Sequence, residues 1–273
     1  MSLIPKEIEA YYLQGMEAGR LANDWGELER VRTLAILARN LPSSPAVVFD
    51  IGGGAGVYAV PLAKQGYKVH LIDPVDLHLE QARKNAGESG IALASMCLGD
   101  ARHLEVPSMS ADAVLLLGPL YHLVERSDRL QALRESCRIL KPGGVLLAAA
   151  ISRFASLIDG LSSGYFQHEE FRKIVAADLA SGRHNNPTKH PAYFTTAYFH
   201  GPAELAAEVG EAGFGDVQIL SVEGPAWSAA MFRAAWSNEV QKEKLLGFLS
   251  LIEREPSLHG ASAHLIAVAN RLG

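Results

Sequence analysis

Short apolar runs alternate with amphipathic segments from residue 46 onwards. The apolar runs are unbroken, which is typical of strands covered on both faces. The segments between them carry apolar residues at helical spacing, and the third ends at a Lys-Pro-Gly-Gly signal. This alternation predicts an α/β protein with a parallel sheet and crossover helices. The expected strands are 46–51, 68–73, 92–98, 112–117 and 144–151, and the expected helices between them are 57–66, 75–90 and 128–140.

The rhythm changes after residue 151. The stretch 152–200 is helical and rich in aromatic residues, with no convincing internal strand, and ends in a polar loop. The alternation of helix and strand then resumes, which predicts one α/β core interrupted by an insertion. Two helical segments, 5–21 and 25–40, precede the core. After the insertion we expect helices at 202–213 and 228–254 and strands at 216–222 and 263–269.

Composition narrows the class of protein. Of the 273 residues 48% are hydrophobic and 20% charged, as in a well-buried globule. The net charge of −5 argues against a protein that grips a phosphate backbone, so no nucleic-acid partner is expected. Cys97 and Cys137 lie far apart without metal-ligand spacing, which favours reduced thiols. With no signal peptide pattern and no apolar run of membrane-spanning length, we expect a cytoplasmic protein that does not enter a membrane.

A glycine-rich loop, Asp-Ile-Gly-Gly-Gly-Ala-Gly at 50–56, follows the first expected strand. A strand that leads through such a loop into a helix brings backbone N–H groups and a helix N-terminus against a ligand. The dinucleotide form of this loop is G-x-G-x-x-G. Counted from Gly52, its third glycine would fall on Val57, whereas the glycines present are Gly52, Gly54 and Gly56. The dinucleotide spacing therefore fails by one residue.

Two aspartates follow the next two strands. Asp73 lies 21 residues after Gly52, where a carboxylate can accept hydrogen bonds from both hydroxyls of a ribose. Nicotinamide enzymes and nucleoside-binding methyltransferases share that feature, so Asp73 alone does not separate them. Asp100 ends the third strand and suits an exocyclic amine such as adenine N6. A turn or helix-cap role is the alternative for each, and their position beside the glycine loop disfavours it.

The motifs at 50–56, 71–74, 98–101, 112–123 and 140–152, taken in order, resemble the class I S-adenosylmethionine-dependent methyltransferases over residues 46–151. Residues 11–21 are similar to the helix before the core in a bacterial small-molecule branch of that family. The resemblance implies a Rossmann-like, mostly parallel seven-stranded sheet in the order 3-2-1-4-5-7-6, with the last strand antiparallel. It also implies S-adenosylmethionine as cofactor, with S-adenosylhomocysteine as product.

The same resemblance implies that residues 1–273 form one methyltransferase domain with four parts. Residues 1–44 form an N-terminal helical flap, 45–151 the cofactor-binding half, 152–200 a helical substrate lid, and 201–273 the remainder of the sheet. The implied cofactor-binding residues are Tyr12, Arg20, Asp50, Gly52, Gly53, Gly54, Asp73, Pro74, Asp100, Ala101, Leu117, Gly118 and His122.

The implied contacts follow the cofactor from end to end. The glycines 52–54 lie under its methionine part, and Asp50 orients its amino group. Asp73 binds the ribose, Pro74 lies against the adenine, and Asp100 and the Ala101 N–H read the adenine edge. The carbonyl of Leu117 and Gly118 lie by the ammonium and sulfonium. Arg20 is a lid residue that pairs with the methionine carboxylate, or else a solvated arginine near Glu17.

Methyl transfer from a sulfonium needs mainly a positioned acceptor and exclusion of water, and a general base only where the acceptor is protonated. We predict His122 and Tyr121 as catalytic residues, because they follow the fourth strand on the edge that carries the cofactor. For His122 a base, a pocket wall and a packing role all stay open. The further candidates for a base are His200, His168 and Tyr165.

The expected acceptor is a small molecule, methylated on oxygen or nitrogen, in a mostly apolar pocket beneath the insertion. Residues 118–121, Gly-Pro-Leu-Tyr, invite comparison with the Asn/Asp-Pro-Pro-Tyr motif of amino-methylating nucleic-acid enzymes. In that motif the first side chain accepts hydrogen bonds from the target amine, and Gly118 has no side chain to do so. His184 and His190 have no credible ligand companions, so no metal site is predicted. A nicotinamide oxidoreductase, an RNA methyltransferase and a non-catalytic cofactor-binding protein remain the alternatives, and the oligomeric state stays open.

Overall fold

Seven strands form a single mixed sheet in the computed structural model, which describes residues 5–12, 24–228, 230 and 232–273. The strand order is β3-β2-β1-β4-β5-β9-β8. The strands are β1 (Val47–Ile51), β2 (Lys68–Asp73), β3 (Ser95–Leu98), β4 (Ala111–Leu116), β5 (Leu140–Ile151), β8 (Phe214–Ser221) and β9 (His264–Arg271).

Strand β9 is the antiparallel member of this sheet. The pairs from β3 across to β5 are all parallel, whereas β9 runs antiparallel to both β5 and β8. Its first residue, His264, therefore pairs with Ile151, the last residue of β5. The predicted order 3-2-1-4-5-7-6 with an antiparallel last strand is confirmed.

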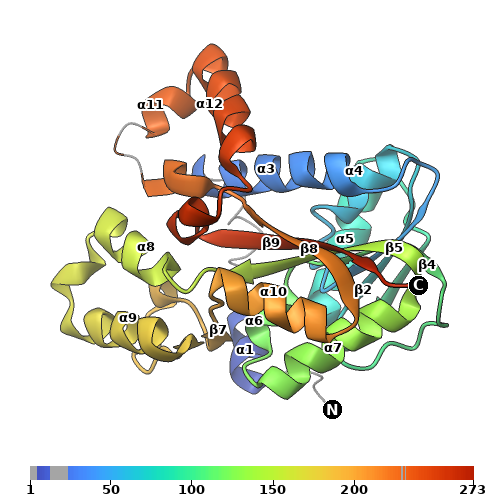
Figure 1. Cartoon of the computed structure of the whole chain (residues 1–273), viewed down its shortest axis with the longest axis horizontal. Coiled ribbons are helices and arrows are strands. Elements are labelled where there is room, and N and C mark those ends of the chain that lie inside the picture. Colours follow the sequence, from blue (N-terminus) through green and yellow to red (C-terminus); the bar gives the residue numbers. More distant parts are fainter. Residues whose placement is uncertain (1–4, 13–23, 229, 231) are drawn as a thin grey trace.

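Helices cover both faces of the sheet (Figure 1). One face carries α3 (Asp24–Asn40), α4 (Ala59–Lys64) and α5 (Asp76–Glu88), and the other carries α6 (Pro119–His122), α7 (Arg126–Ile139) and α10 (Pro202–Glu211). The stretch expected as one helix at 228–254 is broken into α11 (Phe232–Trp236) and α12 (Glu239–Ile252), because Asn238 leaves the helical conformation and caps α12. Both helices lie above α3 (Figure 1), where Trp25 stacks on Phe232 with ring centroids 3.9 Å apart.

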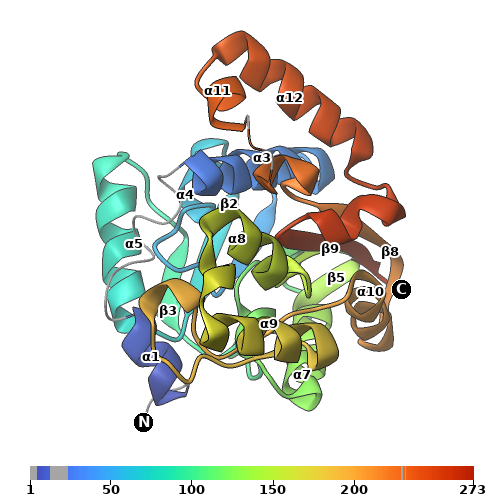
Figure 2. The same cartoon turned by 90° about the vertical axis from the view of Figure 1, so that its left-hand side faces the viewer.

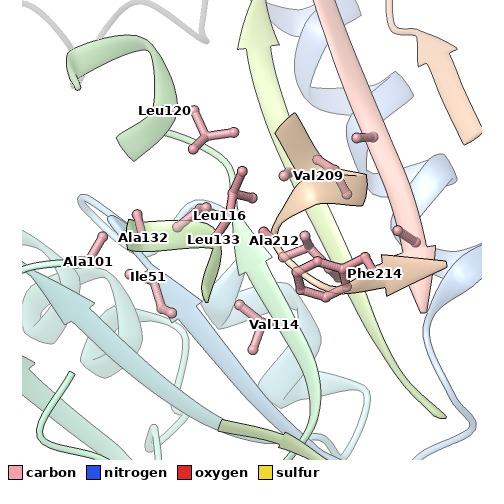
Figure 3. Close-up of a cluster of buried hydrophobic side chains, with 14 of the residues drawn as sticks. Ile51, Ala101, Val114, Leu116, Leu120, Ala132, Leu133, Val209, Ala212 and Phe214 are labelled. Carbon is pink, nitrogen blue, oxygen red and sulfur yellow. The ribbon is translucent and has the colours of Figure 1, made fainter. Parts of the chain in front are cut away.

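The unbroken apolar strands supply two cores, one on each face. In β4, Val114 and Leu116 pack under α7 and α10, while Ala113 and Leu115 face α3 and α4. Figure 3 shows the first of these cores, with side chains of β1, β4, α7 and α10 directed into the same space. Burial on both faces explains why the strand sequences show no alternation of apolar and polar residues.

The insertion after β5 forms a separate layer over one end of the sheet (Figure 2). It contains α8 (Ala155–Ser163), α9 (Glu169–Ser181) and a two-residue ladder between β6 (Arg183–His184) and β7 (Ala197–Tyr198). The expectation of no strand here was wrong, because a ladder this short leaves no periodic pattern in the sequence.

The N-terminal helix α1 (Lys6–Tyr12) occupies the start of the expected helix 5–21, whose remainder lies outside the described residues. None of the described helices has the length and apolar character needed to cross a membrane. The described residues also contain four 3-10 turns: η1 (Tyr165–Gln167), η2 (Pro191–Tyr193), η3 (Gly224–Ser228) and η4 (Pro256–Ala261).

Candidate active site

The glycine loop is fastened to the end of the neighbouring strand β2. Gly52 N donates to the Ile72 carbonyl at 2.7 Å, and Gly54 N donates to Asp73 Oδ2 at 2.8 Å. Gly52 has a φ of +70°, and a Cβ there would lie 2.7 Å from the Pro119 ring. Gly54 has a φ of +54°, but a Cβ there would meet no atom within 4 Å. The loop is thus close-packed below Gly52 and open above Gly54, where a ligand can approach the backbone.

The open side of the loop faces a cavity of about 740 Å³ at the carboxyl ends of the parallel strands. Both the position and the size are typical of small-molecule sites in such folds. The N-terminal helix α1 covers this cavity, since Glu7 and Ile8 belong to the cavity wall. The side chain of Tyr12 and the whole of Arg20 lie outside the described part of the chain. The other predicted site residues all line this cavity: Asp50, Gly52, Gly53, Gly54, Asp73, Pro74, Asp100, Ala101, Leu117, Gly118, Tyr121 and His122.

Asp50 is a buried carboxylate without a donor. Its residue is 1% exposed, and neither carboxylate oxygen has a hydrogen-bond partner within the described part of the chain. Burial, reinforced by the charge of Asp73, raises the pKa of Asp50 to about 7. A buried carboxylate on a cavity wall suits a cationic group of a ligand, which would supply the missing charge and hydrogen bonds. The α-ammonium of S-adenosylmethionine is such a group, so this residue fits the predicted cofactor.

Asp73 is engaged by three donors of the chain. Its Oδ2 accepts from Gly54 N, and its Oδ1 accepts from Val75 N at 3.0 Å and bonds His78 Nδ1 at 2.9 Å. These bonds fix the carboxylate in one orientation at the cavity wall while Oδ2 keeps acceptor capacity for a ribose hydroxyl. His78 also lines the cavity, and the sequence analysis did not predict it. Its position in the first turn of α5 offers no signal that it turns back onto the strand end.

Asp100 is held in a forked ion pair with Arg102. Arg102 Nη2 lies 2.6 Å from Asp100 Oδ2, and Arg102 N donates to Asp100 Oδ1 at 2.8 Å. Arg102 Nη1 continues to Asp128 Oδ2 at 2.9 Å. Arg102 and Asp128, which the sequence analysis missed, also line the cavity. An adenine amine at this end would therefore meet a carboxylate that already has a cation beside it.

His122 is a wall residue with weakened basicity. Part of its side chain faces the cavity, but its Nδ1 atom is buried. Burial, together with nearby His78, lowers the pKa of His122 to about 3, and a hydrogen bond that the ring donates to the Thr196 backbone offsets this only in part. A histidine with so low a pKa stays neutral at working pH and is a weak general base. The prediction that His122 is catalytic is untested, and its electrostatics favour the alternative of a neutral pocket wall.

The other candidate bases are engaged away from the main cavity. His200 is fully buried and bonds Glu208 Oε2 through Nε2 at 3.2 Å. His168 bonds the Tyr193 hydroxyl within the insertion. Neither histidine is among the residues that line the two cavities described here.

A second cavity of about 180 Å³ lies between the sheet and the insertion. Six of its fourteen wall residues are aromatic, and Asp159 and His184 add polar groups. It shares two wall residues, Tyr121 and His264, with the first cavity. The two cavities therefore adjoin at these side chains. The aromatic wall residues are Tyr121, Phe171, Tyr193, Phe194, Phe199 and Trp227.

His264 at this junction is paired with a buried glutamate. Its Nδ1 lies 2.6 Å from Glu223 Oε1, and Glu223 is 2% exposed. Glu29 of α3 approaches the same nitrogen at 3.8 Å, so potential ligand atoms of all three residues lie within 4.8 Å of one another. This group was not predicted from the sequence. The two partners of the close pair are 41 residues apart and neither follows a recognisable motif.

The strand order, with the cavity at the point between β1 and β4 where that order reverses, defines the class of fold: it is that of the class I, S-adenosylmethionine-dependent methyltransferases. A solved S-adenosylmethionine-dependent methyltransferase from Thermotoga maritima, described as a possible histamine N-methyltransferase, superposes with a TM-score of 0.59. The likeness covers 97% of this chain and 98% of that one at 19% identity, so it concerns the fold.

Sequence comparisons find methyltransferases over part of the chain. Residues 48–144 match the family model described as a methyltransferase domain. The ubiquinone biosynthesis O-methyltransferase of Methylocella silvestris is 33% identical over 111 residues, which cover 39% of this chain and 40% of that protein. A ubiquinone/menaquinone biosynthesis C-methyltransferase of Caulobacter vibrioides is 29% identical over 167 residues, covering 54% and 65%. The chain thus matches less than two thirds of the length of these relatives. Its sequence is similar to methyltransferases over that part, and its fold is that of the class I S-adenosylmethionine-dependent methyltransferases.

Proposed function

We propose that this chain transfers the methyl group of S-adenosylmethionine to oxygen or nitrogen of a small, largely apolar acceptor. The observation that carries the proposal is the pair of adjoining cavities. The larger one has the glycine loop and Asp50 in its wall, the smaller one is aromatic, and both share Tyr121 and His264. A donor and an acceptor bound in the two cavities would meet at these shared residues.

The residues of the larger cavity fit the three parts of the cofactor. Asp50 would accept hydrogen bonds from the amino group, the Asp73 carboxylate from the ribose, and Asp100 with the Ala101 N–H would contact the adenine. When bound, S-adenosylmethionine supplies a methyl group that is already activated by its positive sulfur. The chain would then orient the acceptor and exclude water, which are the main requirements of such a displacement.

The size of the second cavity supports an acceptor with a single ring. Its volume of about 180 Å³ is close to the roughly 150 Å³ of an engineered apolar cavity that binds benzene. Two of the relatives are named for methylation steps in quinone biosynthesis, one on oxygen and one on carbon. The aromatic wall favours a ring compound of that general kind, and the insertion 152–200 would act as its lid.

Cofactor binding gives the first test. Calorimetry with the full chain should show S-adenosylhomocysteine binding, no binding of NAD or NADP, and a weaker affinity in Asp73→Ala. Transfer of a labelled methyl group from S-adenosylmethionine to a mixture of small metabolites should be lost in the same variant. Binding of NAD without S-adenosylhomocysteine would contradict the proposal and favour an oxidoreductase. Cofactor binding without any transfer would favour a non-catalytic protein.

The cellular setting belongs to the same proposal. Both cysteines, exposed Cys97 and half-buried Cys137, are free thiols. Free thiols agree with a reducing compartment, so we place the protein in the cytoplasm. The acidic net charge of −5 supports a small-molecule acceptor over a nucleic acid.

A further inference from the structure

His264 stands where the two cavities adjoin. It begins strand β9 and pairs across the sheet with Ile151, the residue at which β5 ends and the chain enters the insertion. Its side chain is 22% exposed and contributes to the walls of both cavities. A group at this place can touch an acceptor in the small cavity close to the methyl group presented from the large one.

Glu223 fixes the ring of His264. The buried carboxylate accepts from His264 Nδ1 through Oε1 at 2.6 Å. Its second oxygen, Oε2, accepts from the His264 backbone N at 3.0 Å and lies 2.8 Å from the Ser262 hydroxyl. Because a proton on Nδ1 is held by the carboxylate, the lone pair of the neutral ring is on Nε2, as in the histidine of a catalytic triad.

Two carboxylates face the Nδ1 side of the His264 ring. Glu223 at the end of β8 and Glu29 on α3 face Nδ1 at 2.6 and 3.8 Å. Arg32, also on α3, is a cation whose field reaches Glu223, and its guanidinium is paired with Glu253 at 2.5 Å. Two carboxylates beside the ring stabilise an imidazolium as it forms. The Glu223 oxygens are occupied by hydrogen bonds of the chain, so we assign this group to proton transfer and not to a metal ion.

We propose that His264, positioned by Glu223, is the general base of the reaction and that the acceptor is a small phenol bound in the second cavity. The inference rests on the proposed function. The phenol O–H proton passes to His264 Nε2 while the oxygen forms a bond to the methyl carbon. The bond from that carbon to sulfur breaks with its electron pair left on sulfur, giving an aryl methyl ether and the neutral thioether. The imidazolium then returns its proton to solvent.

A coloured phenol tests this without knowledge of the natural acceptor. 4-Nitrophenol has a pKa close to neutral, and its anion is yellow. It is titrated into the full chain saturated with S-adenosylhomocysteine, at about pH 6, where free nitrophenol is mostly neutral. In the wild type we expect the bound probe to be ionised, with an apparent pKa about one unit or more below that of the free compound.

Matched variants locate the proton acceptor. His264→Ala should lower the ionised fraction of the bound probe about tenfold, and His264→Gln serves if the alanine variant is unstable. Glu223→Gln should give an intermediate result, moving the ionisation profile of the bound probe along the pH axis without abolishing binding. Asp159→Asn tests for a rival base in the same cavity, and we expect the loss of ionisation to follow His264 and not Asp159. Glu211→Ala, which lies outside both cavities, is the neutral control and should leave the ionised fraction unchanged.

Other outcomes overturn the inference while leaving the proposed function standing. These are S-adenosylhomocysteine binding without nitrophenol binding, equal ionisation in wild type and His264→Ala, or loss of ionisation in Asp159→Asn alone. Ionisation that disappears with a chelator and returns with Mg²⁺ would assign the group to a metal and would also overturn it. Failure to bind S-adenosylhomocysteine contradicts the proposed function itself, so the two failures are distinguishable.

Discussion

Replacing Asp50 by asparagine should stabilise the unliganded protein while weakening cofactor binding. Burial and the charge of Asp73 raise the pKa of Asp50 from 3.8 to about 7. Between these values the folded protein holds a proton that the unfolded chain has released, so stability falls as the pH rises through this window, and the loss is complete above about pH 7. At about 1.4 kcal/mol per unit, the charged carboxylate costs about 4 kcal/mol at alkaline pH.

Asparagine carries no charge at any pH, but its buried amide costs about 1–3 kcal/mol if it finds no partner. That cost does not vary with pH, so it cancels when the two proteins are compared at two pH values. The stability of Asp50→Asn relative to wild type should therefore rise by about 2–3 kcal/mol between about pH 5 and about pH 8. Urea unfolding of both unliganded proteins at the two pH values measures this difference.

Asp112→Asn is the control, because the pKa of Asp112 is shifted in the opposite direction to that of Asp50. Burial, which raises the pKa of Asp112, is outweighed by hydrogen bonds from Lys141 Nζ and Val47 N, so its pKa is lowered. Its stabilising contribution is already present above the unfolded pKa, and removing it should destabilise the protein equally at both pH values. Wild type and Asp50→Asn curves that run parallel from pH 5 to pH 8 would refute the reasoning about a buried charge.

Calorimetry with S-adenosylhomocysteine separates the second half of the prediction from the first. The wild-type affinity should decrease below about pH 7, because the ammonium needs the ionised Asp50. Asp50→Asn should bind S-adenosylhomocysteine about ten- to a hundredfold more weakly at pH 8, since it loses a charge-assisted hydrogen bond. The affinity of this variant should not change between about pH 5 and about pH 8. Unchanged affinity would remove Asp50 from the ammonium site even if the stability result holds.

Two further predictions concern the loop and the opposite side of the sheet. Gly52→Ala should destabilise the protein by about 1–3 kcal/mol in thermal unfolding, because its Cβ would lie 2.7 Å from a proline ring. Gly54→Ala should cost less stability, because its Cβ would meet no atom within 4 Å. That Cβ would project into the cavity, so this variant should still weaken S-adenosylhomocysteine binding. Glu208→Ala should cost about 3–5 kcal/mol by leaving buried Arg129 unpaired, without altering cofactor affinity. Glu211→Ala, on the exposed side of the same helix, should change stability by less than about 1 kcal/mol.

The sequence was sufficient for the sheet and for one side of the site because both depend on local patterns. Asp73 and Asp100 each end an apolar run, and parallel strands bring their carboxyl ends to one edge, so their positions follow from the order of the strands. Val57 stands where the dinucleotide motif requires its third glycine, so a few consecutive residues are enough to distinguish this loop from that motif. Such features need no knowledge of how distant segments pack.

The missed residues depend on contacts between segments that the sequence does not join. His78 turns from α5 onto Asp73, and Arg102 bridges Asp100 to Asp128 on α7. The low pKa of His122 likewise arises from burial by neighbouring segments, which no motif encodes. Sequence patterns identify which residues are near the edge of the sheet, while their charge states are set by packing.

The direction of β9 explains why the His264 pair escapes a search based on strand ends. In the strands that run in the same direction as β5, the functional residues follow the carboxyl end of the strand, as Glu223 follows β8. Strand β9 runs the other way, so its first residue and not its last reaches the same edge of the sheet, opposite Ile151. In this fold the site is therefore built from the carboxyl ends of six strands and the amino end of one. Candidate bases should be sought at that amino end as well, where His264 contributes to the walls of both cavities.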